Sequence, residues 1–265
     1  MPAVPLSDLQ YFLLDMDGTV YLGPRAIPGA QEFIAYLRAS GRRYLFFTNN
    51  PAGDAARYSE KLQQLGIEAT PADILTSGEA TTRYLVSETP YRRLYVLGTP
   101  SFEQELVRAG LELTNSRPDA VVLAFDTTLT YTKLEQACLL LREGLPYIAT
   151  NPDKVCPTDY GYIPDCGSIA ALLEAATGRA PKYIGKPNVE MVRMGLEKLG
   201  ADPARTAMVG DRLYTDMEMA LRAGITAICV LSGETRAEQL AAAPQHPHYV
   251  FESVGQLKQA LEASG

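Results

Sequence analysis

The chain alternates between short apolar runs and longer stretches in which apolar residues return every three or four positions. The first run, at 11–14, predicts a strand buried on both faces. Helical spacing follows over 33–37 and ends at Gly41, and a second run at 44–47 precedes a second helical stretch over 55–65. Helices of this length can cross over between parallel strands, so the first part of the chain predicts strand, helix, strand, helix in a parallel sheet.

A second, smaller α/β unit is predicted from about Thr81 onward. Its strands and helices alternate as before, and no linker rich in serine, glycine or proline separates it from the first unit, so the pattern leaves open whether it is an insertion. A loop is predicted over 150–167, and its tyrosines Tyr160 and Tyr162 are interpreted as loop anchors. The expected strands are 94–97, 120–125 and 146–149, and the expected helices are 102–108, 134–141 and 168–176.

The last part of the chain returns to the alternation of the first. Its clearest strands are the apolar runs at 206–209 and 225–230. Together with the first part, it predicts an α/β fold around a parallel sheet. The remaining expected elements are strands at 182–184 and 249–251 and helices at 189–199 and 254–261.

Composition and charge argue against two classes of protein. The 265 residues are 46% hydrophobic and 21% charged, which is ordinary for a globular protein, and no apolar run is long enough to span a membrane. A net charge of −7 and a pI near 5.0 argue against a nucleic-acid binder, which needs a basic surface. The N-terminus has neither the basic nor the apolar part of a secretory signal, so we expect a cytoplasmic protein.

The cysteines and histidines do not favour a metal site. The four cysteines are far apart and form no Cys-x-x-Cys motif, which favours reduced, mostly buried thiols over zinc ligands or disulfides. The two histidines, His246 and His248, lie in a stretch flanked by prolines. A His-x-His pair can bind a metal, but no third ligand is near, so we interpret the stretch as a surface loop.

Side chains suited to chemistry follow the first strand directly. Asp15 and Asp17 are spaced i and i+2, and Gly18 and Thr19 come next. Ligands of open α/β sheets bind beyond the carboxyl ends of the strands, and a glycine turn there lets backbone N–H groups approach an anion. An ordinary Asp-Gly turn would explain the same residues, so this stretch alone does not distinguish a site from a turn.

Three further predicted strand ends carry polar residues. Thr48-Asn49-Asn50 follows the second strand, and a helix N-cap is the alternative explanation for it. Lys186 stands where a helix is expected to begin, and an isolated lysine there is ordinarily solvated. Asp211 and Asp216 follow a later strand, and a capped helix would explain one of these acids better than both.

Taken in order, the four stretches resemble the motifs of the haloacid dehalogenase-like phosphohydrolases. They read Asp-Met-Asp-Gly-Thr at 15–19, Phe-Thr-Asn-Asn at 47–50, Gly-Lys-Pro at 185–187 and Gly-Asp-Arg-Leu-x-Thr-Asp at 210–216. The joint match is specific because four separated motifs occur in the family's order. Within that superfamily, the chain is similar over nearly its whole length to the NagD-like, p-nitrophenylphosphatase group.

The resemblance implies how the chain is divided. The group has a C2-type α/β cap inserted between the second and third motifs. We therefore expect a doubly wound parallel-sheet catalytic core over 1–80 and 181–265. A smaller α/β cap over 81–180 would select the substrate.

The expected cap matches the group's pattern in three places and departs from it in one. The departure is Pro164-Asp165-Cys166-Gly167, where the group usually has a Pro-Gly-x-Gly-like run. Because this loop borders the cap, the departure bears on substrate specificity and leaves the core chemistry untouched. The matching segments are Ala-Thr-Asn-Pro-Asp at 149–153, Pro157-Thr158 and Gly167-Ser168-Ile169.

The resemblance and the strand-end position assign catalytic roles to the two acids of the first motif. A carboxylate can attack phosphorus and form an aspartyl-phosphate, which divides one difficult displacement into two easier ones, and Asp15 is the nucleophile on this reasoning. The leaving alkoxide needs a proton, and the later water must lose one. Asp17 is therefore expected to act first as acid and then as base. The family's carbon–halogen hydrolases lack this second aspartate, so its presence favours phosphoryl transfer.

The remaining acids suit a magnesium ion. A phosphate dianion cannot approach several carboxylates without cations, and Mg²⁺ prefers hard oxygen ligands. We assign Mg²⁺ to the carboxylates of Asp15 and Asp211 and to the backbone carbonyl of Asp17. Asp216 is expected to orient Lys186 or a water on the metal.

The other motif residues are expected to hold the phosphate. The charge of Lys186 can neutralise Asp15 and a phosphate oxygen together. The remaining phosphate oxygens would be bound by hydroxyl, amide and backbone N–H groups. These come from the residues Gly18, Thr19, Thr48, Asn49 and Asn50.

The sequence therefore predicts a Mg²⁺-dependent phosphatase that hydrolyses a small phosphorylated metabolite, with neither nucleic acid nor a membrane as partner. A phosphotransferase or mutase of the same superfamily is one alternative, since it would pass the phosphoryl group to a second hydroxyl instead of water. A binding protein that senses a phosphometabolite without turnover is another, although sensing needs no proton shuttle such as Asp17. The physiological substrate and the oligomeric state, a homodimer included, stay open.

Overall fold

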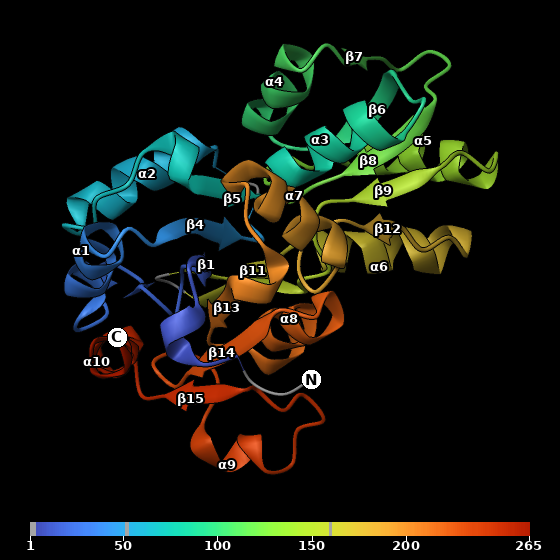
Figure 1. Cartoon of the computed structure of the whole chain (residues 1–265). Coiled ribbons are helices and arrows are strands. Elements are labelled where there is room, and N and C mark those ends of the chain that lie inside the picture. The colour runs from blue at the N-terminus through green and yellow to red at the C-terminus, as the bar shows by residue number, and fades with distance from the viewer. Residues whose placement is uncertain (1–3, 51–52, 159–160) are drawn as a thin grey trace. The chain divides into compact units, whose positions relative to one another are not determined.

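The computed structural model describes residues 4–50, 53–158 and 161–265, so the predicted loop anchor Tyr160 lies outside the described residues. The chain forms two compact units (Figure 1). The first unit comprises Met1–Thr48, Ala55–Leu75 and Val192–Gly265, and the second comprises Asn49–Asp54 and Thr76–Met191. Their assignment as catalytic core and cap stays a prediction.

The first unit is built on a six-stranded sheet in the order β15-β14-β13-β1-β4-β5. Parallel pairing joins β15 to β14, β14 to β13, β13 to β1 and β1 to β4. Strand β13 is buried along its whole length, and β1 is buried from Phe12 to Asp15, as apolar runs predict. The strands are β1 (Tyr11–Asp15), β4 (Arg43–Thr48), β5 (Ile74–Thr76), β13 (Thr206–Gly210), β14 (Thr226–Val230) and β15 (Tyr249–Phe251).

The strand order reverses between β1 and β13. From β1 the chain continues outward through β4 to β5, and from β13 it continues in the opposite direction through β14 to β15. Leu14 of β1 pairs with Val209 of β13, so the two strands end side by side. Such a reversal leaves a crevice at the carboxyl ends of the strands, which is where ligands of open α/β sheets bind.

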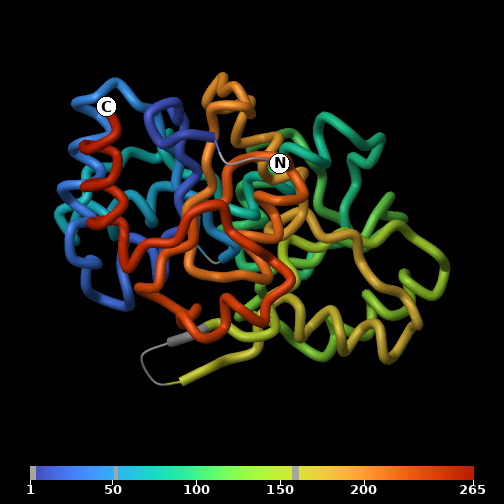
Figure 2. Tube along the Cα trace, turned by 60° about the horizontal axis from the view of Figure 1, so that its bottom comes forward, coloured from blue at the N-terminus to red at the C-terminus, as the bar shows by residue number. Residues whose placement is uncertain are grey.

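Helices pack on both faces of this sheet. Phe12 points to the face covered by α1 and lies edge-on to Phe33 at 6.2 Å between ring centroids. Figure 2 shows α1 beside α10, although they lie near opposite ends of the chain. Phe47 points to the other face, against Gly195 of α7. The helices are α1 (Ala30–Ala39), α2 (Ala55–Gln64), α7 (Val189–Leu199), α8 (Glu218–Ala223), α9 (Ala237–Leu240) and α10 (Val254–Ser264). The doubly wound core is confirmed.

The second unit is a smaller parallel α/β unit with a core of its own, as predicted. Its main sheet has five strands in the order β12-β9-β8-β6-β7, and α5 and α6 pack on one face around Leu97, Leu123 and Leu173. The strands are β6 (Arg93–Leu97), β7 (Glu112–Leu113), β8 (Ala120–Leu123), β9 (Tyr147–Ala149) and β12 (Lys182–Tyr183). The helices are α3 (Ser77–Glu88), α4 (Pro100–Arg108), α5 (Tyr131–Arg142) and α6 (Cys166–Thr177).

The prediction of an unstructured loop over 150–167 is wrong. Its middle is an antiparallel hairpin of β10 (Val155–Thr158) and β11 (Gly161–Pro164). The hairpin is stable because Cys156 and Ile163, which face each other, pack against the apolar core of the second unit. Further elements were not predicted. They are the helices α3 and α9, the short strands β5 and β7, and the small hairpin of β2 (Tyr21–Leu22) and β3 (Arg25–Ala26).

The four cysteines are free thiols, as expected, and Cys166 and Cys229 are buried. His246 is exposed, while the Nδ1 of His248 accepts a hydrogen bond from the Ala227 N–H at 2.9 Å. Among the described residues, no helix has the length and apolar character needed to cross a membrane.

Candidate active site

The predicted nucleophile Asp15 is the last residue of β1 and is 8% exposed. The hydroxyl of Thr19 donates to its Oδ2 at 3.5 Å. In the turn between them, the Gly18 N–H donates to the carbonyl of Tyr21 at 2.7 Å. Gly18 has a φ of +92°, and a Cβ there would lie 2.3 Å from Oδ2 of Asp211. The turn therefore requires glycine for its backbone angle and for its close approach to the next acid.

Asp211 and Asp216 come from the segment after β13. Asp211 follows the strand directly, and a π-helical turn over Leu213–Met217 carries Asp216. The N–H groups of Asp216 and Met217 both donate to the carbonyl of Arg212, at 3.1 and 3.2 Å, and the Arg212 N–H donates to Asp216 Oδ2 at 3.2 Å. This wide turn directs Asp216 back toward the strand end, and π-turns of this kind occur often at functional sites.

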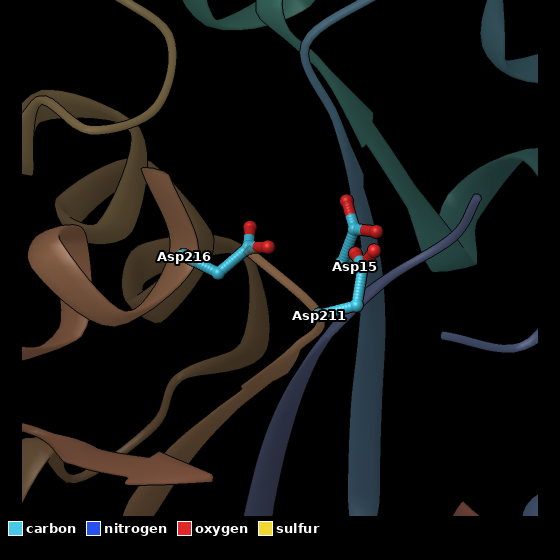
Figure 3. Close-up of side chains that lie close together, drawn as sticks. All are labelled: Asp15, Asp211 and Asp216. Carbon is cyan, nitrogen blue, oxygen red and sulfur yellow. The ribbon is translucent and has the colours of Figure 1, made fainter. Parts of the chain in front are cut away.

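Asp15, Asp211 and Asp216 form one carboxylate cluster (Figure 3). Each offers an oxygen within 4.8 Å of those of the other two, and the three side chains point toward one another from the ends of β1 and β13 and from the π-turn. Gly233 closes one side, since a Cβ there would lie 2.0 Å from Asp211 Oδ2. The backbone thus packs directly against the cluster and leaves no room for side chains.

The carboxylate cluster fits a divalent cation. Oδ1 of Asp211 is buried and has no hydrogen-bond partner in the described part of the chain. Burial, and then the charges of Asp15 and Asp216, raise the pKa of Asp211 to about 8. These buried carboxylates repel one another, and one of their oxygens has no hydrogen-bond partner. Such a site suits a hard cation that prefers oxygen ligands, such as Mg²⁺.

Asp17 has the surroundings of an acid catalyst. It is half-buried in the turn after β1. Burial raises its pKa, the charge of Lys61 opposes this, and the charge of Asp15 adds to it. A raised pKa keeps a carboxyl protonated closer to neutral pH, which a group that must give and then take a proton requires.

A loop after β14 completes this edge of the sheet, and the sequence did not predict it. The Ser232 hydroxyl donates to the Gly18 carbonyl at 2.7 Å. The Glu234 N–H donates to Asp211 Oδ2 at 2.7 Å, and the Thr235 N–H donates to the Asp211 carbonyl at 3.1 Å. The segment Ser232–Gly233–Glu234 stands directly beyond a buried strand next to β13, so the strand-end rule could have identified it.

The predicted phosphate-binding residues belong to different units. Thr48 is part of the first unit, whereas Asn49, Asn50 and Lys186 are part of the second. Thr48 ends β4, one residue beyond Phe47, which pairs with Asp15. In the second unit, the Lys186 N–H donates to Asn49 Oδ1 at 2.8 Å, and Asn49 Nδ2 donates to the Lys186 carbonyl at 2.9 Å. The side chain of Asn49 thus binds both backbone groups of Lys186, a residue that is only 3% exposed.

The segment that departs from the group's pattern caps a helix. Asp165 is the N-cap of α6, and its side chain accepts from the Cys166 N–H. Gly167 packs on the backbone, since a Cβ there would lie 2.1 Å from the carbonyl of Pro152. Tyr162, on the adjacent hairpin, is 77% exposed. The replacement of the usual glycine by Asp165 therefore supplies a helix cap.

Comparison with known proteins identifies the family of this chain. A sequence model of haloacid dehalogenase-like hydrolases matches residues 12–112, and a second model, of HAD-hydrolase-like proteins, matches residues 183–257. The acid sugar phosphatase of Staphylococcus aureus strain MRSA252 is 36% identical over 97% of this chain and 100% of its own length.

Two solved structures extend the comparison. The crystal structure of 4-nitrophenylphosphatase from Thermotoga maritima has a TM-score of 0.93 and 44% identity, and the match covers 97% of this chain and 98% of that one. Glycerol phosphate phosphatase from Mycobacterium tuberculosis, solved in complex with magnesium, has a TM-score of 0.91 and 31% identity over 99% of this chain and 80% of that one. The chain belongs to the haloacid dehalogenase-like hydrolases and, within them, is a phosphatase of the NagD-like, 4-nitrophenylphosphatase group.

Proposed function

We propose that this phosphatase hydrolyses small phosphomonoesters with Mg²⁺ through a phosphorylated Asp15. The observation that carries the proposal is the cluster of Asp15, Asp211 and Asp216 at the reversal point of the sheet, beside the half-buried Asp17. A buried nucleophile, an acid with a raised pKa and a set of metal-ligating oxygens are the components that this chemistry needs.

In the proposed reaction, Asp15 attacks phosphorus and the bond to the leaving oxygen breaks. Asp17 gives its proton to that oxygen, and then takes a proton from the water that cleaves the aspartyl-phosphate. Thr19 holds Asp15 through the hydrogen bond at its Oδ2. The backbone N–H groups of the turn after β1 would bind phosphate oxygens.

Mg²⁺ would be held by the carboxylates of Asp15 and Asp211 and by the backbone carbonyl of Asp17, with Asp216 beside them. It would supply positive charge that lets an anionic phosphate approach anionic side chains. Lys186, which we place among the phosphate-binding groups, would add a fixed charge. Thr48, Asn49 and Asn50 would bind the remaining phosphate oxygens.

Sugar and polyol phosphates are the proposed substrate class. The names of the Staphylococcus aureus and Mycobacterium tuberculosis relatives, an acid sugar phosphatase and a glycerol phosphate phosphatase, support this choice. We also propose that the second unit is the cap that selects among such substrates. Its own apolar core and its place in the chain between the second and third motifs support that role.

The test is the variant Asp15→Asn, assayed for phosphate release from 4-nitrophenyl phosphate and from a panel of sugar phosphates with Mg²⁺ present. We expect a folded protein whose turnover falls at least about 10³-fold, because the nucleophile is lost. Asp8→Asn, at an exposed position, removes the same charge and should keep full activity. Undiminished hydrolysis by the Asp15 variant would refute the role of Asp15.

A second variant tests the covalent step. In Asp17→Asn, the water that cleaves the intermediate lacks its base, while 4-nitrophenolate leaves without a proton. The phosphorylated protein should therefore accumulate and appear as a phosphate adduct in intact-protein mass spectra. Slow turnover by this variant with no adduct at any time would argue for direct attack by water.

A further inference from the structure

An ion pair borders the carboxylate cluster in the first unit. Arg212, the residue after Asp211, places its Nε 3.0 Å from Oε2 of Glu234. The same oxygen accepts a hydrogen bond from the Tyr214 hydroxyl at 3.2 Å. The Arg212 side chain is 28% exposed and that of Glu234 48%, so the arginine lies on the inner side of the pair.

The charge of Arg212 acts on the acids of the site. Burial alone would lower the pKa of Arg212, yet its pKa is raised, because Asp15, Asp211 and Asp216 lie close to it. In return, its charge opposes the rise that burial causes in the pKa of Asp17 and of Asp211. The guanidinium therefore lies within the electric field of the carboxylate cluster.

Glu234 is tied to the carboxylate cluster as well as to the arginine. Its backbone N–H donates to Asp211 Oδ2 at 2.7 Å, and its carboxylate forms the ion pair with the guanidinium of Arg212. The Arg212 N–H donates to Asp216 Oδ2. The backbone thus fixes two acids of the cluster, and the guanidinium of Arg212 adds a positive charge beside them.

We propose that Arg212, held in place by Glu234, is a resident counter-charge that keeps the carboxylate cluster assembled before a metal ion binds and lowers its affinity for that ion. The choice of Mg²⁺ as the ion rests on the proposed function. Arg212 and Glu234 are positioning residues, since they act on the acids and not on the substrate.

Removing the charge of Arg212 should change stability and metal affinity in opposite directions. Three carboxylates in so small and buried a space repel one another, and a guanidinium that stays charged at every physiological pH offsets part of that repulsion. The same charge repels an incoming dication. Removing the guanidinium charge should therefore make the metal-free protein less stable and metal binding tighter. Simple structural damage would instead lower the stability and also weaken metal binding.

The experiment compares Arg212→Gln, Arg212→Lys and Glu234→Gln with the unaltered chain. The melting temperature is measured without metal in the presence of a chelator, and the dissociation constant of Mg²⁺ is measured by calorimetry without substrate. Arg25→Gln and Glu238→Gln are the matched controls, since both positions are exposed and the substitutions change the net charge equally.

We expect Arg212→Gln to melt several degrees lower without metal and to bind Mg²⁺ about threefold to tenfold more tightly, the size expected for a charge several ångströms from a dication. Arg212→Lys keeps the charge and should restore both values, while Glu234→Gln should weaken Mg²⁺ binding about twofold to fivefold. Unchanged or weaker Mg²⁺ binding in Arg212→Gln would overturn the proposal. If the unaltered chain binds no Mg²⁺, the metal assignment of the proposed function fails, and the melting temperatures of Arg212→Gln and Arg212→Lys still decide the inference.

Discussion

Glu105 offers a test of electrostatics in the second unit. It lies in α4 of the second unit, where burial raises its pKa to about 7. The Thr82 hydroxyl, which donates to its Oε1 at 3.1 Å, opposes that rise, and the charges of Glu79 and Asp54 add to it. The ordinary value is 4.5, so the folded protein keeps a proton on this carboxyl over a pH range in which the unfolded chain has lost it.

The sign follows from proton linkage. Between about pH 4.5 and pH 7 the folded state binds more protons at Glu105 than the unfolded state, so the free energy of unfolding falls as the pH rises and levels off above pH 7. A shift of this size corresponds to about 3 kcal/mol, and partial solvation of the side chain reduces that to about 2 kcal/mol. Glu105→Gln removes the ionisation, so it should stabilise the protein by about 2 kcal/mol at pH 8 and change little at pH 4.5.

The assay is urea unfolding of both proteins at the two pH values. Comparing each variant with the parent at the same pH cancels the titration of all other groups. Glu103→Gln, in the same helix, removes the same charge and serves as the control. An equal effect of Glu105→Gln at pH 4.5 and at pH 8 would show that the carboxyl does not titrate differently in the folded state.

Two further predictions concern the packing of charged groups. Gly18→Ala should lower the free energy of unfolding by about 1–3 kcal/mol and weaken Mg²⁺ binding in calorimetry, because the added Cβ meets Asp211 and φ is +92°; unchanged Mg²⁺ binding would contradict this. Lys133→Met should cost about 3–5 kcal/mol in urea unfolding, because it leaves the carboxylate of Asp126, whose side chain is fully buried, without the cation 2.7 Å away. Adding Asp126→Asn should recover much of that loss, and a double variant as unstable as the single one would argue against an electrostatic cause.

The motif strands could be predicted because their signals are local. The four apolar residues before Asp15 suit a strand buried on both faces, and β1 is found at Tyr11–Asp15. Helix α3 also carried a local signal that the periodicity did not show. Apart from Leu85, its buried residues are small or polar, but Thr76 precedes Glu79 by three positions and accepts a hydrogen bond from the Glu79 N–H.

The hairpin of β10 and β11 could not be predicted from the same kind of pattern. Its strands are four residues long and contain Pro157 and Pro164, which count against a strand. The two strands pair with each other, and their inner residues Cys156 and Ile163 are held by a core that is formed elsewhere in the chain. The stabilising interactions are therefore not local.

The site itself shows where strand-end reasoning succeeds and where it stops. It suggested that Asp15 and Asp211 meet, but their proximity depends on β1 and β13 being neighbours at the reversal of the strand order, which joins residues about 200 positions apart. Glu234 was overlooked although its segment stands just beyond β14, because a single carboxylate among serine, glycine and threonine is typical of an ordinary loop. It gains a role only because β14 lies beside β13, so that its N–H reaches Asp211 and its carboxylate reaches Arg212. A carboxylate that would be an ordinary loop residue in isolation therefore becomes part of the electrostatics of the carboxylate cluster through the order of the strands.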